Sequence, residues 1–151
     1  MIKTAHMKLF KGFTLIELLI VIAILGILAA AVLVAINPSK RTNQARDAQR
    51  KNDIGSLATE LQGYYTTPGQ GEYTIDLSTL VTQGYLKQLP TPPDGGSYTY
   101  VESSTVGPNG GSTEVAVYDA LDDPTVAANV WCWRSSTGNA IETTALLCTA
   151  P

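Results

Sequence analysis

Histidine is almost absent from this sequence. The only one among 151 residues is His6, which lies in a short basic segment ahead of a long apolar run. The rest of the chain therefore lacks the usual general base and the commonest metal ligand of proteins. It also has no nucleophile–base pairing and no glycine motif that would cradle a phosphate. These absences argue against an enzyme, and we predict no cofactor and no metal.

Basic residues are also scarce. Ten Lys and Arg stand against thirteen Asp and Glu, which gives a formal net charge of −3. Because Lys and Arg contacts to phosphates dominate the affinity for nucleic acids, this balance disfavours a nucleic-acid partner. Asp119, Asp122 and Asp123 are too few and too irregularly spaced for a metal site, and we interpret them as surface acidity.

Only two cysteines are present, Cys132 and Cys148. In isolation such a pair could form a disulfide, remain as two buried thiols or supply half of a metal site. The long apolar run favours an extracytoplasmic C-terminal part, where disulfides persist, so we favour the disulfide. Closing a loop of this size would stabilise a small domain by about 3 kcal/mol in the chain-entropy model.

What the chain does contain is a long apolar run. The 19 residues from Leu18 to Ile36 include no charged or strongly polar side chain. About 20 apolar residues suffice to span a bilayer, so we expect residues 13–36 to form a transmembrane half-helix. Glu17 lies near its start. Because an ionisable group is costly inside a membrane, Glu17 is a candidate functional residue.

The helix is predicted to continue beyond the apolar run. In residues 37–65 a charged stretch precedes apolar residues spaced at three- and four-residue intervals, which is typical of a helix with one buried face. These apolar residues are Ile54, Leu57, Ala58, Leu61, Tyr64 and Tyr65. The simplest interpretation is one helix over about 13–65, disturbed near Gly26 and Pro38. The breaker cluster TTPGQG at 66–71 ends it.

Residues 66–151 have the pattern of a small β-rich head. Three runs favour strands, and a GPNGG turn joins the first two as a hairpin. The runs are 98–102, 114–121 and 130–134. We therefore predict an α+β fold in which a small antiparallel sheet packs its apolar face on the C-terminal half of the helix.

The residues around Gly12 carry a specific resemblance. The segment KGFTLIE, continued as LLIVIAILGILAA to Ala30, resembles the prepilin signal of type IV pilins and type II secretion pseudopilins. The resemblance implies that prepilin peptidase removes a leader of residues 1–12, cutting between Gly12 and Phe13, and that the new terminal Phe13 is N-methylated. Glu17 then matches the acidic residue that this family carries five places into the mature chain.

The resemblance also implies a structural function. The chain would be a subunit of a type IV pilus-like filament, a helical homopolymer whose core is built from the N-terminal helices. Before assembly it would cross the inner membrane once, with its head outside the cytoplasm; afterwards it would be part of a cell-surface filament. The implied partners are other copies of itself, prepilin peptidase, membrane lipid, an inner-membrane assembly platform and its ATPase motor.

Cleavage would change the charge pattern at the junction. Loss of three lysines leaves the mature chain with a net charge of −6. We expect the ammonium of Phe13 on a neighbouring subunit to pair with Glu17, a partner that arises only after cleavage.

Counting Lys and Arg on each side of the span gives three before it and five after it, which would place the head in the cytoplasm. We give the family resemblance more weight than this count, so we expect the head to lie outside the cytoplasm.

Further expectations come from the same family. The stretch from Gly26 to Pro38 corresponds to a segment that loses helicity in assembled filaments, although Pro38 lies about one helical turn later than usual. The loop closed by Cys132 and Cys148 resembles the disulfide-closed C-terminal region of pilins. The acidic calcium loop expected of the major pseudopilin is not seen.

Other functions stay open. The chain could instead be a type II secretion-type pseudopilin, or a minor pilin with an adhesin or DNA-uptake role in which Trp131, Trp133 and Arg134 form a contact site. Alternation along a strand places both tryptophans on one face and Cys132 on the other, so we favour packing for them. The resemblance to pilins also implies a role in cell adhesion and motility. The surface ligand, glycosylation, retraction and the start at Met1 or Met7 do not follow from the sequence.

Overall fold

The computed structural model describes residues 12–149, so the leader before Gly12 and both possible starts lie outside the described residues. Contacts divide the chain into two units, one up to Pro38 and one from Ser39 onward. We call the second unit the head. The predicted α+β fold is confirmed: a long N-terminal helical run is followed by a small antiparallel sheet.

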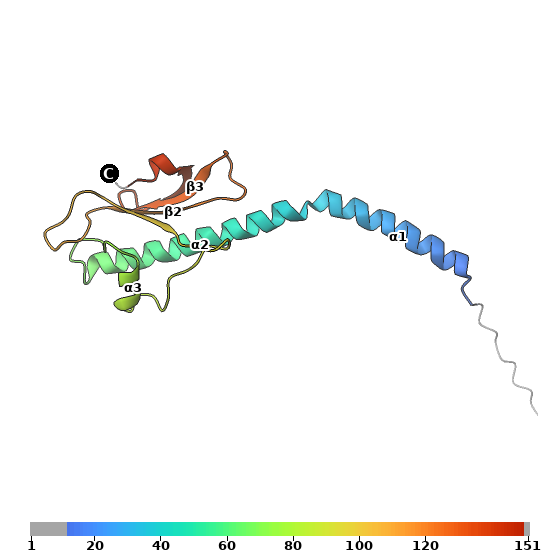
Figure 1. Ribbon diagram of the computed structural model, residues 1–151, viewed down its shortest axis with the longest axis horizontal. Coiled ribbons are helices and arrows are strands. Elements are labelled where there is room, and N and C mark those ends of the chain that lie inside the picture. Colours follow the sequence, from blue (N-terminus) through green and yellow to red (C-terminus); the bar gives the residue numbers. More distant parts are fainter. Residues whose placement is uncertain (1–11, 150–151) are drawn as a thin grey trace, which may run out of the picture. The chain divides into compact units, whose positions relative to one another are not determined.

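The first unit contains a single helix, α1, which spans Leu15–Ile36 (Figure 1). It is apolar on all sides, and none of its residues is buried within the chain. The helix passes through Gly26 without interruption, so the expected disturbance at this residue is not present in the single chain. Glycine has a low helix propensity, but it keeps its N–H, and the hydrogen-bond ladder remains intact.

The helical run is interrupted at Asn37. This residue has φ 46° and ψ 77°, in the left-handed region that ends many helices. The next helix, α2, begins at Pro38 and ends at Thr66. Proline suits a first helical position because its fixed φ is already helical and the missing N–H would have had no partner inside the helix.

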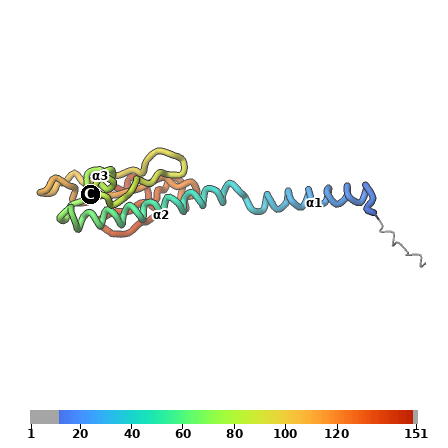
Figure 2. The backbone as a smooth tube through the Cα atoms, turned by 90° about the horizontal axis from the view of Figure 1, so that it is seen from below, coloured from blue at the N-terminus to red at the C-terminus, as the bar shows by residue number. Residues whose placement is uncertain are grey.

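In the head, a four-stranded sheet packs on α2 (Figures 1 and 2). Its strands run antiparallel in the order β1-β2-β3-β4. They are β1 Thr99–Glu102, β2 Val115–Ala120, β3 Asn129–Arg134 and β4 Ala140–Thr144. The predicted hairpin forms the β1–β2 pair. The fourth strand, with the sequence AIETT, is not among the predicted strands.

The inner face of the sheet and the apolar face of α2 share one core. Ile54, Leu57 and Leu61 of α2 are fully buried against Val117 and Trp133, which are paired neighbours on β2 and β3. The short helix α3 (Ser78–Thr82) adds its buried Leu80 to the same core. The three- and four-residue spacing seen in the sequence therefore marks the side of α2 that the sheet covers.

The outer face of the sheet carries a second, smaller cluster. Cys132 is fully buried there and forms a disulfide with Cys148, with 5.8 Å between their Cα atoms. Ala116 and Val130 complete the cluster. Cys148 directly follows the 3-10 helix η1 (Ala145–Leu147), so the disulfide fixes the C-terminal segment to β3.

Candidate functional site

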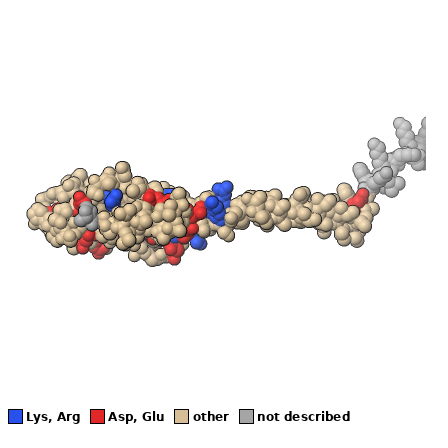
Figure 3. Space-filling model, turned by 90° about the horizontal axis from the view of Figure 1, so that it is seen from above, with Lys and Arg blue, Asp and Glu red and all other residues tan. Residues whose placement is uncertain are grey.

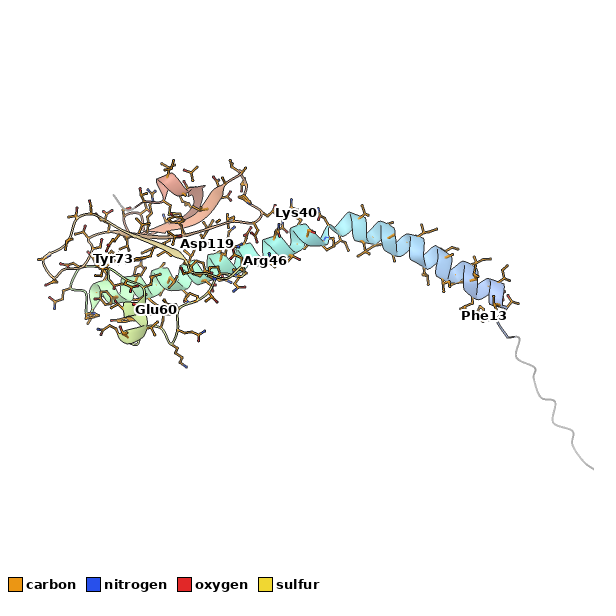
Figure 4. All side chains as sticks on the ribbon, viewed as in Figure 1. Phe13, Lys40, Arg46, Glu60, Tyr73 and Asp119 are labelled. Atoms are coloured by element: carbon orange, nitrogen blue, oxygen red, sulfur yellow. A yellow bond between two sulfur atoms is a disulfide. The ribbon has the colours of Figure 1, made fainter. Side chains whose placement is uncertain are left out.

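The junction between Gly12 and Phe13 lies in non-helical chain just ahead of α1. Both residues are exposed, and the Phe13 side chain is 86% exposed (Figure 4). A Cβ atom added to Gly12 would meet no other atom within 4 Å. The chain's own packing therefore does not require glycine at this position, and a requirement for it would have to come from a molecule that acts on the junction.

Glu17 lies in the first turn of α1, where it forms a capping box with Thr14. The backbone N–H of Thr14 donates to Glu17 Oε2 at 2.9 Å, and the Thr14 hydroxyl donates to the same oxygen at 2.8 Å. In return, the backbone N–H of Glu17 donates to Thr14 Oγ1 at 3.2 Å. This arrangement satisfies two backbone donors that a helix start leaves without intrahelical partners.

The capping box corrects one expectation. We expected a partner for Glu17 to arise only after cleavage, but Thr14 already binds its carboxylate within the chain. The pattern Thr14-x-x-Glu17 is the sequence signature of this motif, so the sequence contained the information. Both hydrogen bonds from Thr14 end on Oε2, and no bond between described residues ends on Oε1.

Beyond Glu17, the surface of α1 is formed by apolar side chains. All its residues are exposed, and Figure 3 shows no Lys or Arg along it on the face in view. By length and composition, the helical run that starts at Leu15 is able to cross a membrane. Gly26 has open space around it, so a neighbouring helix could approach the backbone closely at this point.

Comparison with known proteins identifies this end of the chain. The family model of the prokaryotic N-terminal methylation motif matches residues 7–33, which include the junction, the capping box and most of α1. Type II secretion system core protein G of Pseudomonas aeruginosa is 39% identical over 112 residues, covering 65% of this chain and 78% of that protein. The chain belongs to the type IV pilin and pseudopilin family.

Other relatives agree with this assignment. Type II secretion system core protein G of Vibrio cholerae is 34% identical over 121 residues, covering 67% of this chain and 77% of the relative. The protein of the same name from Escherichia coli is 34% identical over 107 residues, covering 60% and 71%. No solved structure matches the chain. This member of the family is a pilin-like subunit with a membrane-anchor helix.

The head of this pilin-like chain contains a buried ionic network centred on Arg50. The guanidinium is 1% exposed and bonds Asp47 at 2.8 Å, Asp119 at 3.0 Å, Asp122 at 3.1 Å and Asp94 at 3.3 Å. The network joins α2 to the loop before β1, to β2 and to the loop after β2. It is therefore a cross-link between segments that lie far apart in the sequence.

This network corrects the interpretation of Asp119 as surface acidity, and it shows that Asp122, although exposed, also pairs with Arg50. Burial acts to lower the pKa of Arg50, but hydrogen bonding and charge from Asp122, together with Asp47 and Asp94, raise that pKa above its ordinary value. Burial also raises the pKa of Asp119, against the attraction of Arg50. The available sequence signal was the spacing of Asp47 and Arg50, which places these two opposite charges on one face of the helix.

Asp47 has a second function in the same place. Its two carboxylate oxygens accept the backbone N–H groups of Asp122 and Asp123, each at 2.8 Å. Asp123 therefore contributes its backbone to the network, and its side chain accepts a hydrogen bond from Gln44 at 3.0 Å. Figure 4 shows Asp119 on the side of the sheet that faces α2. Asp119, Asp122 and Asp123 therefore connect the end of β2 and the β2–β3 loop to α2.

The tryptophans pack as the alternation along the strand predicted. Trp133 is 2% exposed on the inner face, and Trp131 lies half-buried on the same face while Cys132 points to the other. The Lys51 ammonium lies 4.6 Å from the centre of the Trp131 ring, within the range of a cation–π contact. Both rings are thus engaged within the head, and the prediction of packing is confirmed.

A further buried carboxylate was missed entirely. Glu72 accepts the backbone N–H of Asn109 at 2.8 Å and that of Gly111 at 2.7 Å, which fixes the turn between β1 and β2. A Cβ atom added to Gly111 would approach the Tyr73 carbonyl oxygen to 2.6 Å. No local pattern connects Glu72 to residues almost forty positions away, so only the folded chain reveals this contact.

Proposed function

We propose that this chain is a pseudopilin, a filament subunit of a type II secretion-type system. In this proposal it is cleaved between Gly12 and Phe13, methylated on Phe13 and polymerised through α1, and its role is structural rather than catalytic. The observation that carries the proposal is α1 itself, an apolar helix of 22 residues with none buried, which begins two residues after Phe13. The protein G relatives favour a secretion system as its setting.

The physical argument starts from the exposed apolar surface. Such a surface is stable only when lipid or other apolar side chains cover it. A membrane covers α1 before assembly, and the α1 helices of neighbouring copies would cover it in a filament. The open position at Gly26 allows two helices to approach closely. A head-to-tail assembly of this kind does not close, so it grows as an open helix.

The charged groups at the junction would then set the register. Cleavage creates an ammonium on Phe13, and methylation would keep its positive charge. The Glu17 carboxylate already binds Thr14 through Oε2, which leaves Oε1 to accept from the ammonium of a neighbouring copy. A pair with one member missing leaves an uncompensated charge, so misaligned copies are disfavoured.

The proposal includes an orientation and a set of partners. Prepilin peptidase would act on the cytoplasmic side, and the head would lie outside the cytoplasm, where the Cys132–Cys148 disulfide is stable. An assembly platform and its ATPase would extract the subunit from the membrane. Protease added to spheroplasts checks the orientation: the head should be digested, and protection of the head would show that it faces the cytoplasm.

A type IV pilus is the second candidate. The observation that favours it is the disulfide-closed C-terminal region, which resembles that of pilins. In that case the filament would extend from the cell surface, where adhesion and motility would be its functions. Deletion of the gene separates the two candidates. Loss of secreted proteins with unchanged surface fibres supports the pseudopilin, whereas loss of surface fibres with normal secretion supports the pilus.

Mass spectrometry of sheared or overexpressed filaments tests the processing. We expect a chain that begins at methylated Phe13, lacks the leader and carries an oxidised Cys132–Cys148 pair. A chain that retains the leader, or that begins elsewhere, would contradict the proposed cleavage. Substitution of Gly12 by Ala offers a matched check, since within residues 12–149 no atom outside the adjoining residues lies within 4 Å of the added methyl group.

A further inference from the structure

The head has a small polar pocket that none of the functions above uses. It has a volume of about 170 Å³ and lies where the end of α2, the start of β2 and the β3–β4 turn meet. Its lining consists of Tyr65, Tyr73, Thr113, Glu114, Ser135 and Ser136. Two phenol rings, one carboxylate and three hydroxyl groups therefore surround the same space, and no basic side chain is among the lining residues.

The carboxylate in this lining is incompletely satisfied. Glu114 Oε2 is buried and has no hydrogen-bond partner among the described residues. Buried polar atoms in folded proteins almost always have such a partner, and a buried carboxylate oxygen without one is particularly costly. Glu114 therefore favours the entry of a cation or a strong hydrogen-bond donor into the pocket beside it.

The aromatic residues indicate which class of cation the pocket would bind. The rings of Tyr65 and Tyr73 lie 4.7 Å apart between centroids with 34° between their planes, and Tyr73 also packs edge-on against Trp133. Burial raises the pKa of Tyr73, with smaller contributions from Tyr65 and Glu114, so its phenol stays neutral. An aromatic face beside a carboxylate attracts organic cations, through cation–π contact as well as charge.

The lining is poorly suited to a metal ion. Calcium takes six to eight oxygen ligands, with several carboxylates among them, whereas this pocket offers a single carboxylate. No group of three or more His, Cys, Asp or Glu able to hold a metal lies within residues 12–149. An ammonium group, by contrast, has three N–H donors. The pocket offers the hydroxyl oxygens of Thr113 and Ser136, and that of Ser135, which also accepts the backbone N–H of Val115 at 2.9 Å.

We propose that this pocket binds a primary alkylammonium group. The ammonium lies beside Glu114 and donates to the hydroxyl groups, while its alkyl stem packs against Tyr65 and Tyr73. Two sources offer this chemistry: the side chain of a lysine on a second copy of the chain, and a small free amine. The first source rests on the proposed filament function, but binding of the ammonium group itself does not.

The test uses the full-length processed protein in detergent micelles, with butylamine hydrochloride at neutral pH as the probe. NMR shifts of isotope-labelled tyrosines should change saturably with the probe, while butanol at the same concentration should leave them unchanged. Glu114→Gln should weaken binding by about tenfold or more, since it removes the ion pair and keeps the shape of the side chain. Tyr65→Leu should weaken it by about threefold to tenfold through loss of an aromatic face.

Glu102→Gln is the matched control, because it removes an exposed carboxylate from β1, outside the pocket lining. It should bind butylammonium as the wild type does. Equal binding by Glu114→Gln and wild type, shifts of the same size with butanol, or displacement of the probe by equimolar calcium chloride would each overturn the proposal. Thermal melting of each variant ensures that a folded head is being compared.

A second experiment separates the two sources. Carbodiimide, which joins carboxylates to amines in direct contact, is applied to assembled filaments, and the joined peptides are identified. A bond between Glu114 and a lysine of another copy assigns the ammonium to a neighbouring subunit. Retained butylammonium binding by the purified protein without such a bond assigns it to a free amine. Failure of the chain to form filaments would refute the proposed function while leaving the butylammonium result intact.

Discussion

The two units of this chain use apolar residues in opposite ways. In α1 every residue is exposed, although nearly all are aliphatic. In the head, α2 is rich in charged residues, yet Ile54, Leu57 and Leu61 are fully buried under the sheet. Apolar content alone therefore does not create a core. A folded core requires a second apolar surface in the same chain. For α1, lipid or other molecules have to provide that surface.

Their charged residues show the same contrast. Among residues 12–149, Glu17 in α1 accepts hydrogen bonds only from Thr14, three residues away, and both of these bonds end on Oε2. Arg50 in the head is buried among four carboxylates of its own chain. In the proposed filament Glu17 would act in assembly, whereas Arg50 connects segments of the folded head. Replacing each of them should accordingly affect different properties of the protein.

The largest expected effect is the loss of filaments in Glu17→Ala. The variant should still be cleaved after Gly12, but filament yield should fall by more than about tenfold, since removing one member of a buried charge pair costs several kcal/mol. Immunoblots of filament and membrane fractions measure assembly, and a size shift on gels measures cleavage. The melting temperature of the head should not change, because Glu17 belongs to the other unit and bonds Thr14 there.

Thr14→Ala separates the capping role of Glu17 from the role in register. It removes the hydroxyl of the capping box and keeps the carboxylate, the Phe13 ammonium and the backbone N–H of residue 14. Loss of a helix cap costs about 0.5–2 kcal/mol, so filaments should be reduced but present. If Thr14→Ala abolished filaments as completely as Glu17→Ala, capping would suffice to explain both results.

In the head, the largest effect should come from Arg50→Ala. Removing one partner from a buried ionic network typically costs about 3–5 kcal/mol in the free energy of unfolding. Urea unfolding followed by tryptophan fluorescence measures it, since Trp131 and Trp133 both lie in the head. Arg46→Ala is the control: Arg46 is 47% exposed and 3.8 Å from Asp122, so its loss should cost about 1 kcal/mol or less. Equal losses would show that burial of Arg50 is not decisive.

Most of the fold follows from sequence patterns that act locally. The long apolar run, the spacing of Ile54, Leu57 and Leu61, and the glycine-rich turn between β1 and β2 each determine nearby structure, so helix, buried face and hairpin were predicted. The fourth strand was missed because AIETT is short and lies at the sheet edge, where two of its five residues are exposed and no strong alternation develops.

The parts that could not be predicted depend on contacts across the chain. Arg50 meets Asp119 and Asp122 about seventy positions away, and Glu72 meets the turn at Asn109. A charge run in a helix has the same local pattern whether its face is solvated or covered by a loop. The capping box is different, because it depends on local sequence. Thr14 and Glu17 are only three residues apart, so the sequence contains the motif, although it was not predicted.

The smallest expected effect concerns Glu142, a carboxylate of the head that, like Glu17, accepts hydrogen bonds from a threonine. Glu142 accepts four hydrogen bonds: from the backbone N–H and hydroxyl of Thr125 at 2.6 and 2.8 Å, from the Asn129 side chain at 3.1 Å and from the backbone N–H of Val126 at 3.3 Å. The Thr125 hydroxyl bond is the main cause that lowers the pKa of Glu142 below its ordinary value of 4.5, against a smaller opposing effect of burial.

Because the folded state holds this carboxyl at a lowered pKa, its stabilising contribution is present above pH 4.5 and is lost as the pH falls below that value. Glu142→Gln should therefore make the head slightly less stable at neutral pH and less sensitive to acid. Urea unfolding of wild type and variant, measured from neutral pH downward, should give curves that converge as the pH falls through this range. Parallel curves would mean that Glu142 does not couple the β2–β3 loop to β4 through its charge, and the resemblance to Glu17 would then be one of geometry alone.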